Sequence, residues 1–117
     1  MSGTEDFVRL RHMLDAARKA LELSKGCDRD NLAKDEKLAL ALLRLLEMIG
    51  EAAKNISEKF QQDNPVIPWR EIAGTRNRLI HGYFDIDLDI IWTIISDDIP
   101  LLVSQLETIL QNKNQFQ

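Results

Sequence analysis

Apolar residues recur at three- and four-residue spacing along most of this 117-residue chain. The widest stripe lies between residues 35 and 62. It consists of Leu38, Leu42, Leu45, Ile49, Ala52, Ile56 and Phe60, with Leu40, Leu43 and Leu46 on another side. Such spacing is that of an α-helix, and so wide a stripe predicts burial on more than one face. We expect either the central helix of a bundle or a helix that also offers a dimer face.

Three more segments show the same helical periodicity, over residues 5–24, 69–81 and 87–110. Thr4 is the expected N-cap of the first of these segments, and the polar stretch 26–31 is the expected turn after it. Pro100 lies inside the last segment and should kink or split it, because proline lacks a backbone donor. The tail over 112–117 is polar.

These patterns predict an all-α protein, a bundle of four to five helices in a single domain over residues 1–117. No strand-like alternation is evident apart from residues 84–90. The hydrophobic fraction of 44% and the charged fraction of 29% are those of an ordinary globular chain.

The net charge of −4 and the pI of about 5.1 argue against a broadly basic nucleic-acid-binding surface. A local basic site on an acidic body is still compatible with them. Cys27 is the single cysteine, so no internal disulfide can form, which fits a reducing compartment. The N-terminus lacks a signal-peptide core, and no apolar run reaches the roughly 18 residues of a membrane span. We therefore expect a cytoplasmic protein without a membrane partner.

The segment from Arg76 to Tyr83 stands out chemically. It reads Arg-Asn-Arg-Leu-Ile-His-Gly-Tyr. Arg70 lies upstream and the next acid downstream is Asp85, so the segment is locally positive. A guanidinium offers a planar fork of donors that fits phosphate oxygens. His81 can exchange a proton near neutral pH.

Arg76, His81 and Tyr83 could together cleave a phosphodiester without a metal ion. His81 would handle the proton of an attacking RNA 2′-hydroxyl or of the leaving oxygen. Arg76 would stabilise the negative charge of the transition state, and Tyr83 would orient the phosphate. The alternative is structural, because arginine and histidine near a helix end often cap carbonyl groups or pair with acids.

A continuous helix would separate Arg76 from His81. Residues five apart lie about 140° apart around a helix axis with 3.6 residues per turn. Asn77 and Arg78 would instead share a face with His81. Two arrangements remain open. The helix ends before His81 and Gly82 lets the chain turn back, or two chains contribute side chains to one shared cleft.

Two sets of acids bear on this site. Glu47 and Glu51 lie four residues apart on one predicted helix face. They are either solvated surface or neighbours of the site, where a carboxylate would hold Arg76 or orient His81.

Asp85, Asp87 and Asp89 suggest a metal site, but the pattern fails. A calcium loop has glycine at its sixth position and glutamate at its twelfth. Counted from Asp85, those positions hold Ile90 and Ser96. We predict no metal and no cofactor, and we expect Asp87 to be a helix N-cap.

The spacing Arg-x4-His-x-Tyr, formed by Arg76, His81 and Tyr83, resembles the signature of the HepT family within the HEPN superfamily. Three flanking blocks also resemble the family, over residues 47–54, 67–74 and 87–92. The resemblance covers about residues 5–110 and is strongest from 47 to 100.

The resemblance implies a HEPN-type helical bundle that forms a homodimer, with the two Arg/His motifs meeting in one cleft. HepT-like proteins are toxins of bacterial and archaeal toxin–antitoxin pairs and are associated with metal-independent RNA cleavage. Arg76 and His81 would be the catalytic residues of this endoribonuclease. The expected supporting residues are Tyr83, Asn77, Arg78, Glu47 and Glu51.

The implied partner is an MntA-like minimal nucleotidyltransferase, the antitoxin of a HEPN/MNT type VII system. It transfers AMP from ATP to the motif tyrosine, which is Tyr83 here. AMP on Tyr83 would place phosphate against Arg76 and Arg78, occupy the site and repel an RNA backbone.

Two other hypotheses compete with the nuclease. One is a non-catalytic helical dimer that binds a nucleotidyltransferase or a nucleotide, and the other is a helical oligomer without an active site. A neighbouring reading frame for a small nucleotidyltransferase would favour the nuclease or the non-catalytic dimer. Growth arrest that depends on His81 would separate those two.

Overall fold

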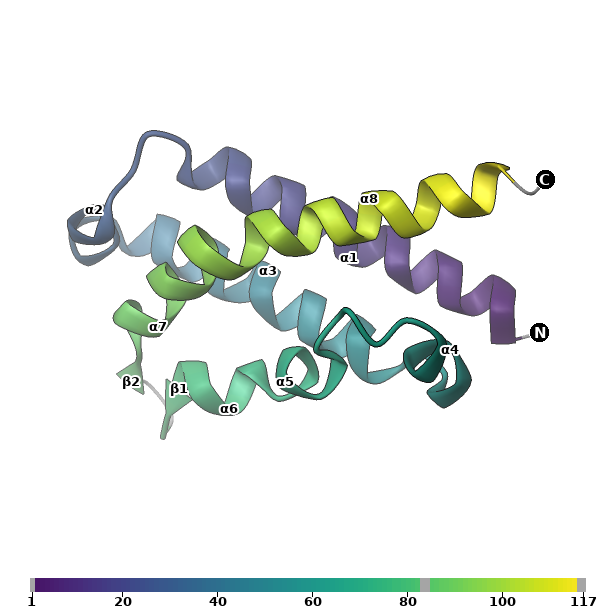
Figure 1. Ribbon diagram of the computed structural model, residues 1–117. Coiled ribbons are helices and arrows are strands. Elements are labelled where there is room, and N and C mark those ends of the chain that lie inside the picture. Colours follow the sequence, from purple (N-terminus) through teal and green to yellow (C-terminus); the bar gives the residue numbers. More distant parts are fainter. Residues whose placement is uncertain (1, 83–84, 116–117) are drawn as a thin grey trace.

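The computed structural model describes residues 2–82 and 85–115, and most of them are helical. Three long helical elements form the framework (Figure 1): α1 (Ser2–Ser24), α3 (Glu36–Lys54) and a C-terminal run of α7 (Leu88–Thr93), the π-helical segment η1 (Ile94–Asp98) and α8 (Ile99–Gln115). The shorter helices are α2 (Arg29–Lys34), α4 (Glu58–Asp63), α5 (Trp69–Ala73) and α6 (Thr75–Leu79). The predicted all-α fold class is confirmed.

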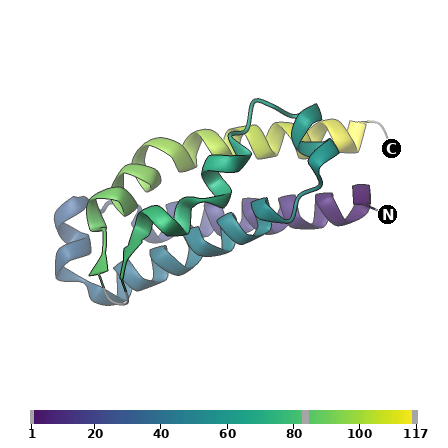
Figure 2. The same ribbon diagram turned by 90° about the horizontal axis from the view of Figure 1, so that it is seen from below.

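Helix α3 runs through the middle of the molecule. In Figure 1, α1 and α8 lie above it and α5 and α6 lie below it. It contacts α1, α2, α5, α6 and α7. In Figure 2, which shows the molecule from below, α5 and α6 lie between α8 and α3. Helix α6, which carries Arg76, is therefore supported by the central helix.

The burial of α3 confirms the wide stripe predicted for it. Its buried residues are Ala39, Leu42, Leu43, Leu46, Ile49, Gly50 and Ala53. Leu42 is fully buried and Leu46 is 2% exposed, and each such side chain contributes about 1.5–3 kcal/mol by leaving water. Leu40 is an exception, since 45% of it is exposed.

The predicted helix over residues 35–62 is wrong in one respect, because it is interrupted after Lys54. Ser57 starts a new helix as its N-cap, and its Oγ accepts a hydrogen bond from the backbone N–H of Phe60 at 3.2 Å. Ile56, in the interruption itself, is only 4% exposed. A buried Ile56 keeps the apolar spacing intact, so periodicity alone could not reveal the break.

The predicted turn over residues 26–31 contains the start of α2. The Asp28 carboxylate accepts from the backbone N–H of Asn31 at 3.0 Å, and the Asn31 side chain accepts from the N–H of Asp28 at 2.6 Å. This reciprocal pair is a capping box. Leu32, 1% exposed, attaches the short helix to the core.

The long helices also extend beyond the predicted limits. The first begins at Ser2, so Thr4 lies inside the helix and does not cap it. The last continues to Gln115, into the segment expected to be a polar tail. Even with these extensions, no helix within residues 2–82 and 85–115 is long and apolar enough to cross a membrane.

Pro100 is accommodated without a break in the C-terminal run over 88–115. It lies in the first turn of α8, directly after the π-helical segment. There the N–H of Ile99 donates to the carbonyl of Ile94, five residues earlier. The predicted split does not occur: the helical run continues, and a π-helical segment lies directly before the proline, which has no N–H to donate.

The predicted helix over residues 69–81 is divided at Gly74 and ends at Leu79. The chain then forms a two-residue strand β1 (Ile80–His81), which pairs antiparallel with β2 (Asp85–Ile86). His81 lies opposite Asp85 in this pairing. These are the only strands among the described residues. The second strand lies within residues 84–90, the stretch whose apolar and polar residues alternate.

A buried carboxylate connects α1 to the start of α4. Asp6 is 2% exposed, and its two oxygens accept hydrogen bonds from the backbone N–H of Ser57 at 2.8 Å and from the Ser57 hydroxyl at 2.6 Å. The same hydroxyl caps α4. Asp6 therefore joins two segments that are 51 residues apart in the chain.

We expect Asp6→Ala to lower the free energy of unfolding by about 2–3 kcal/mol, because it removes a charged acceptor and leaves both Ser57 donors unsatisfied. Urea denaturation measures this change. Asp15→Ala is the matched control, since Asp15 lies on the same helix with 63% of its side chain exposed. An equal loss of stability in the two variants would contradict the assignment.

Candidate active site

The chain leaves the helix two residues before His81. Helix α6 ends at Leu79, and Ile80 is extended, with φ −123° and ψ 122°. Gly82 has φ +83°, a conformation that favours glycine, and it lies at the turn toward β2. The helix thus ends before His81 and the chain turns at Gly82, which is the first of the two arrangements considered from the sequence. Tyr83, the predicted modification site, lies outside the described residues.

Arg76 forms an ion pair with Glu47 of α3, and 3.5 Å separates Nε from Oε2. The Arg76 side chain is 76% exposed, whereas that of Glu47 is 22% exposed. The close approach of α5 to α3 supports this geometry. A Cβ atom at Gly50 would lie 3.0 Å from the carbonyl oxygen of Ile72. The guanidinium is therefore held on one side and open to a ligand on the other.

Arg76 and Asn77 line an open hollow of about 620 Å³ between α6 and α3. From α3 the hollow is lined by Arg44, Glu47, Gly50, Glu51 and Lys54. Arg44 and Lys54 form no ion pair with any residue of the described chain, so this region carries more positive than negative charge. Neither Arg44 nor Lys54 was predicted from the sequence, although their spacing from Glu47 and Glu51 places all four on one helix face.

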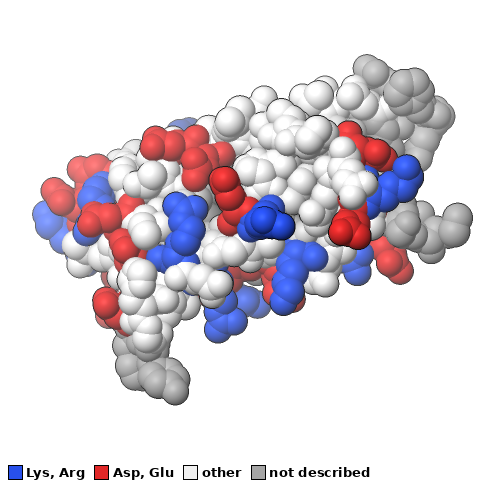
Figure 3. Space-filling view, turned by 60° about the horizontal axis from the view of Figure 1, so that its bottom comes forward, with Lys and Arg blue, Asp and Glu red and all other residues white. Residues whose placement is uncertain are grey.

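The charge in this region is local. Figure 3 shows basic and acidic side chains interspersed over the face turned forward there, without one continuous basic surface. This distribution agrees with the net charge of −4. The forward face thus offers separate basic side chains, without a broad basic patch.

His81 contacts Asp87, with 3.2 Å between Nε2 and Oδ2. Asp87 is also the N-cap of α7, because its Oδ1 accepts from the backbone N–H of Ile90 at 3.0 Å. Its own N–H donates to the carbonyl of Leu79 at 2.8 Å. The predicted N-cap is confirmed, whereas the contact with His81 was not foreseen. Gly82 could have indicated this contact, because a turn at this glycine brings Asp87 back to His81, six residues earlier in the chain.

The pKa of the Asp87 carboxyl is lowered from its ordinary value. The main cause is the hydrogen bond from the backbone N–H of Ile90. Desolvation acts in the opposite direction, and the hydrogen bond and charge of His81 lower the pKa further. Asp87 is therefore ionised at neutral pH and can accept a hydrogen bond from the imidazole.

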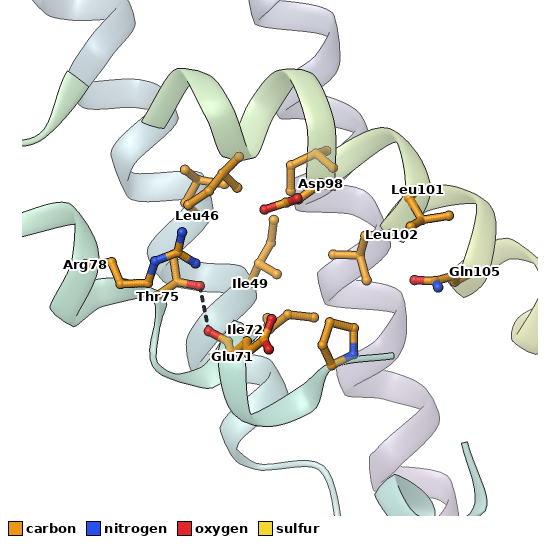
Figure 4. Close-up of a pocket in the computed structure, with 13 residues that line it drawn as sticks. Leu46, Ile49, Glu71, Ile72, Thr75, Arg78, Asp98, Leu101, Leu102 and Gln105 are labelled. Atoms are coloured by element: carbon orange, nitrogen blue, oxygen red, sulfur yellow. Dashed lines mark hydrogen bonds between the residues drawn. The ribbon is translucent and has the colours of Figure 1, made fainter. Parts of the chain in front are cut away.

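Arg78 faces a different hollow from Arg76. This second hollow has a volume of about 130 Å³ and lies between α3, α5 and the junction of η1 with α8. Figure 4 shows Arg78 and Asp98 beside it, from α6 and from the π segment. Its other lining residues are mostly apolar. Arg76 and Arg78 therefore line different hollows of the protein.

Within one chain, the predicted site residues separate into three groups. The hollow beside α3 brings together Arg76, Asn77, Glu47 and Glu51. His81 lies with Asp87 at the hairpin and lines neither of the two hollows. Arg78 stands apart from both groups. Ending the helix early thus does not by itself place Arg76 and His81 in one cavity.

The acids after the motif have separate roles. Asp85 pairs with His81 in the hairpin, Asp87 caps α7, and Asp89 forms an ion pair with Arg29 of α2. Within the described ranges, no group of three or more His, Cys, Asp or Glu side chains could hold a metal ion.

Comparison with known proteins identifies one family. The family model "Ribonuclease HepT-like" matches residues 13–109. A protein of Caldanaerobacter subterraneus subsp. tengcongensis, named as a candidate RNase, is 41% identical over 104 residues, which span 89% of this chain and 93% of that protein.

Two further relatives agree. A Methanocaldococcus jannaschii protein, also named as a candidate RNase, is 35% identical over 100 residues, covering 86% of this chain and 92% of its own. The "Probable ribonuclease HepT" of Thermococcus cleftensis is 47% identical over 73 residues, 62% of this chain and 66% of that protein. No solved structure matches the chain significantly. The match over most of its length shows that this all-α chain belongs to the HepT-like family of ribonucleases, as its Arg-x4-His-x-Tyr spacing and flanking blocks predicted.

Proposed function

We propose that this protein is a cytoplasmic, metal-independent endoribonuclease, the toxin of a HEPN/MNT type VII toxin–antitoxin system. The observation that carries the proposal is the family match across the segment that contains Arg76 and His81. Both side chains are more than half exposed, and each is held by a carboxylate. They are thus oriented and still accessible to RNA.

The chemistry that suits these residues is transesterification of RNA. The 2′-oxygen attacks the adjacent phosphorus, and the bond from phosphorus to the 5′-oxygen breaks. His81 takes the proton of the 2′-hydroxyl, and the departing 5′-oxygen takes a proton from water. Arg76 stabilises the additional charge on the phosphoryl oxygens. The products are a 2′,3′-cyclic phosphate and a 5′-hydroxyl, and no step requires a metal ion.

We expect His81→Ala and Arg76→Ala each to lower the rate of RNA cleavage about 10²- to 10⁴-fold, because each removes one charge- or proton-handling group. The measurement is cleavage of a labelled RNA pool by purified, partner-free protein in EDTA. His12→Ala is the control, because His12 is exposed on α1 and should leave the rate unchanged.

Two results would count against this proposal. Cleavage that EDTA abolishes would contradict metal independence. A wild-type protein that mass spectrometry shows to be free of AMP and that cleaves nothing would favour the non-catalytic dimer instead.

We infer that the active cleft is shared by two copies of the chain. Arg76 lines the hollow on α3, whereas His81 stands at the hairpin and does not line it. A homodimer would let the arginine of one copy approach the histidine of the other. This arrangement is the second of the two that the helical spacing left open.

Mixing the two inactive variants tests a shared cleft. In a heterodimer of Arg76→Ala with His81→Ala, the shared cleft would contain one pair of Arg76 and His81 from opposite copies with both residues intact, and one pair with neither. We expect cleavage to return to about half of the wild-type rate per dimer containing one copy of each, since one of the two pairs is restored. The mixture is made by unfolding and refolding the copies together. If activity stays absent although mixed dimers form, each working pair comes from one chain.

The proposed antitoxin is an MntA-like nucleotidyltransferase that transfers AMP to Tyr83. The tyrosine oxygen would attack the α-phosphorus of ATP, pyrophosphate would leave, and the phenolic proton would pass to solvent. The new phosphodiester adds negative charge within the motif, next to residues that would otherwise contact RNA. The modification would therefore act as a covalent competitor of the substrate.

Tyr83 is the only tyrosine of the chain, which makes its modification simple to follow. We expect wild-type protein co-produced with its nucleotidyltransferase to carry the mass of one or more AMP groups and to be inactive. Tyr83→Phe should carry none. Intact-mass spectrometry measures the modification, and a catalytically inactive nucleotidyltransferase is the control. AMP on Tyr83→Phe would place the modification elsewhere.

A further inference from the structure

We propose that Asp87 is a positioning residue that holds His81 as its Nε2–H tautomer, so that Nδ1 is the nitrogen that takes the proton from RNA. The inference concerns a detail of the ribonuclease function proposed above and rests on it. Sequence reasoning treated Asp87 only as a helix cap, and its contact with His81 is the observation that adds a second role.

The hydrogen bond itself determines the tautomer. Oδ2 of Asp87 lies 3.2 Å from Nε2 of His81. An ionised carboxylate can only accept, so Nε2 must carry the hydrogen. A neutral imidazole has one N–H, which leaves Nδ1 as an acceptor. Among the described residues, Asp87 alone forms a hydrogen bond with the His81 ring, and we infer that Nδ1 is the nitrogen that meets the substrate.

The carboxylate is fixed in place by bonds other than the one to His81. Oδ1 accepts from the N–H of Ile90, and the backbone N–H of Asp87 donates to Leu79. Strand pairing of Ile80 with Ile86 fixes the two chain segments between these anchors. Figure 1 shows the strands below the start of α7, at the end of the bundle that also holds α2. Because both sides of the contact are anchored, the carboxylate can restrict the ring's orientation.

Exposure and charge agree with this role. The Asp87 side chain is 27% exposed and that of His81 is 54% exposed, so the histidine is the more accessible member of the pair. The pKa of Asp87 is lowered, mainly by Ile90, and the group is thus an anion even without help from the histidine. A partly exposed pair of this kind contributes little to stability. Its contribution is to orientation and to the choice of tautomer.

Asp87→Asn separates positioning from capping. Asparagine is as good an N-cap as aspartate, so α7 and the fold should persist. The amide oxygen of the new asparagine would accept from the backbone N–H of Ile90, so the NH₂ group would face Nε2 of His81. An NH₂ group and an Nε2–H are both donors and cannot form a hydrogen bond with each other. Nε2 would then have to become the acceptor, and the proton would move to Nδ1. Asp87→Ser is a second variant, since serine also caps but reaches no ring nitrogen.

The test is a long-range ¹H–¹⁵N spectrum of the full chain labelled at histidine, recorded where the imidazole is neutral. We expect the His81 proton on Nε2 in the wild type, and loss of that preference in Asp87→Asn and Asp87→Ser. His12 forms no hydrogen bond within the described chain, and its signals serve as an internal control that should not change. We also expect kcat for RNA cleavage to fall about 10- to 100-fold with KM unchanged, since only proton transfer is misaligned.

The outcomes separate this inference from the ribonuclease proposal. A wild-type His81 protonated on Nδ1, or the same tautomer in the wild type and both variants, would overturn the role of Asp87. The ribonuclease proposal alone would fail if the unmodified wild type cleaves no RNA. The tautomer assignment would still be supported if His81 is protonated on Nε2 in that wild type and loses this preference in the Asp87 variants. Full activity in Asp87→Asn despite a changed tautomer would exclude Nδ1 as the base.

Discussion

The burial of α3 on several sides is the constraint on which the rest of this structure depends. Leu42, Leu46 and Ile49 are almost entirely removed from water, and helices from both ends of the chain pack around them. Helix α3 contacts α1, α2, α5, α6 and α7. The positions of these contacting helices, including α6 with Arg76, are therefore fixed relative to this helix.

The central helix supplies the core and the site at once. Leu46 is in the core, whereas the next residue, Glu47, pairs with Arg76. One turn later, Gly50 lets α5 approach so closely that a Cβ atom would press on the carbonyl of Ile72. A larger residue there would push α5 and α6 away from α3 and widen the distance between Arg76 and Glu47. The geometry of the site is thus set by backbone packing as well as by charge.

The sequence could predict what depends on helical periodicity. The apolar stripes located the long helices, and the spacing of Arg76, His81 and Tyr83 with its flanking blocks identified the family. The placement of Glu47 beside Arg76 was one of two options that the face of α3 allowed. These features share a cause, because residues three or four apart on a helix must lie together.

The features that periodicity could not predict depend on hydrogen bonds and on tertiary pairing. Ser57 caps a new helix while Ile56 preserves the apolar spacing, so the break is invisible to a hydrophobic pattern. The contact of His81 with Asp87 requires a helix end, a left-handed glycine and a two-residue strand pairing in succession. Each of these three features is local, but no rule of residue spacing predicts the contact that they produce together.

The ion pair between Arg76 and Glu47 is compatible with the phosphate site proposed for this acidic protein. With three quarters of the Arg76 side chain exposed, such a pair contributes at most about 1 kcal/mol. A phosphodiester offers the same guanidinium charge-assisted, bidentate hydrogen bonds, and it would also meet Arg44 and Lys54.

In the proposed nuclease, Glu47 would orient Arg76 in the free protein without preventing its transfer to a substrate. The net charge of −4 would oppose RNA that approaches the acidic parts of the surface. Phosphate binding would then concentrate at the hollow where Arg76 lies beside Arg44 and Lys54, two cations that form no ion pair within the described residues.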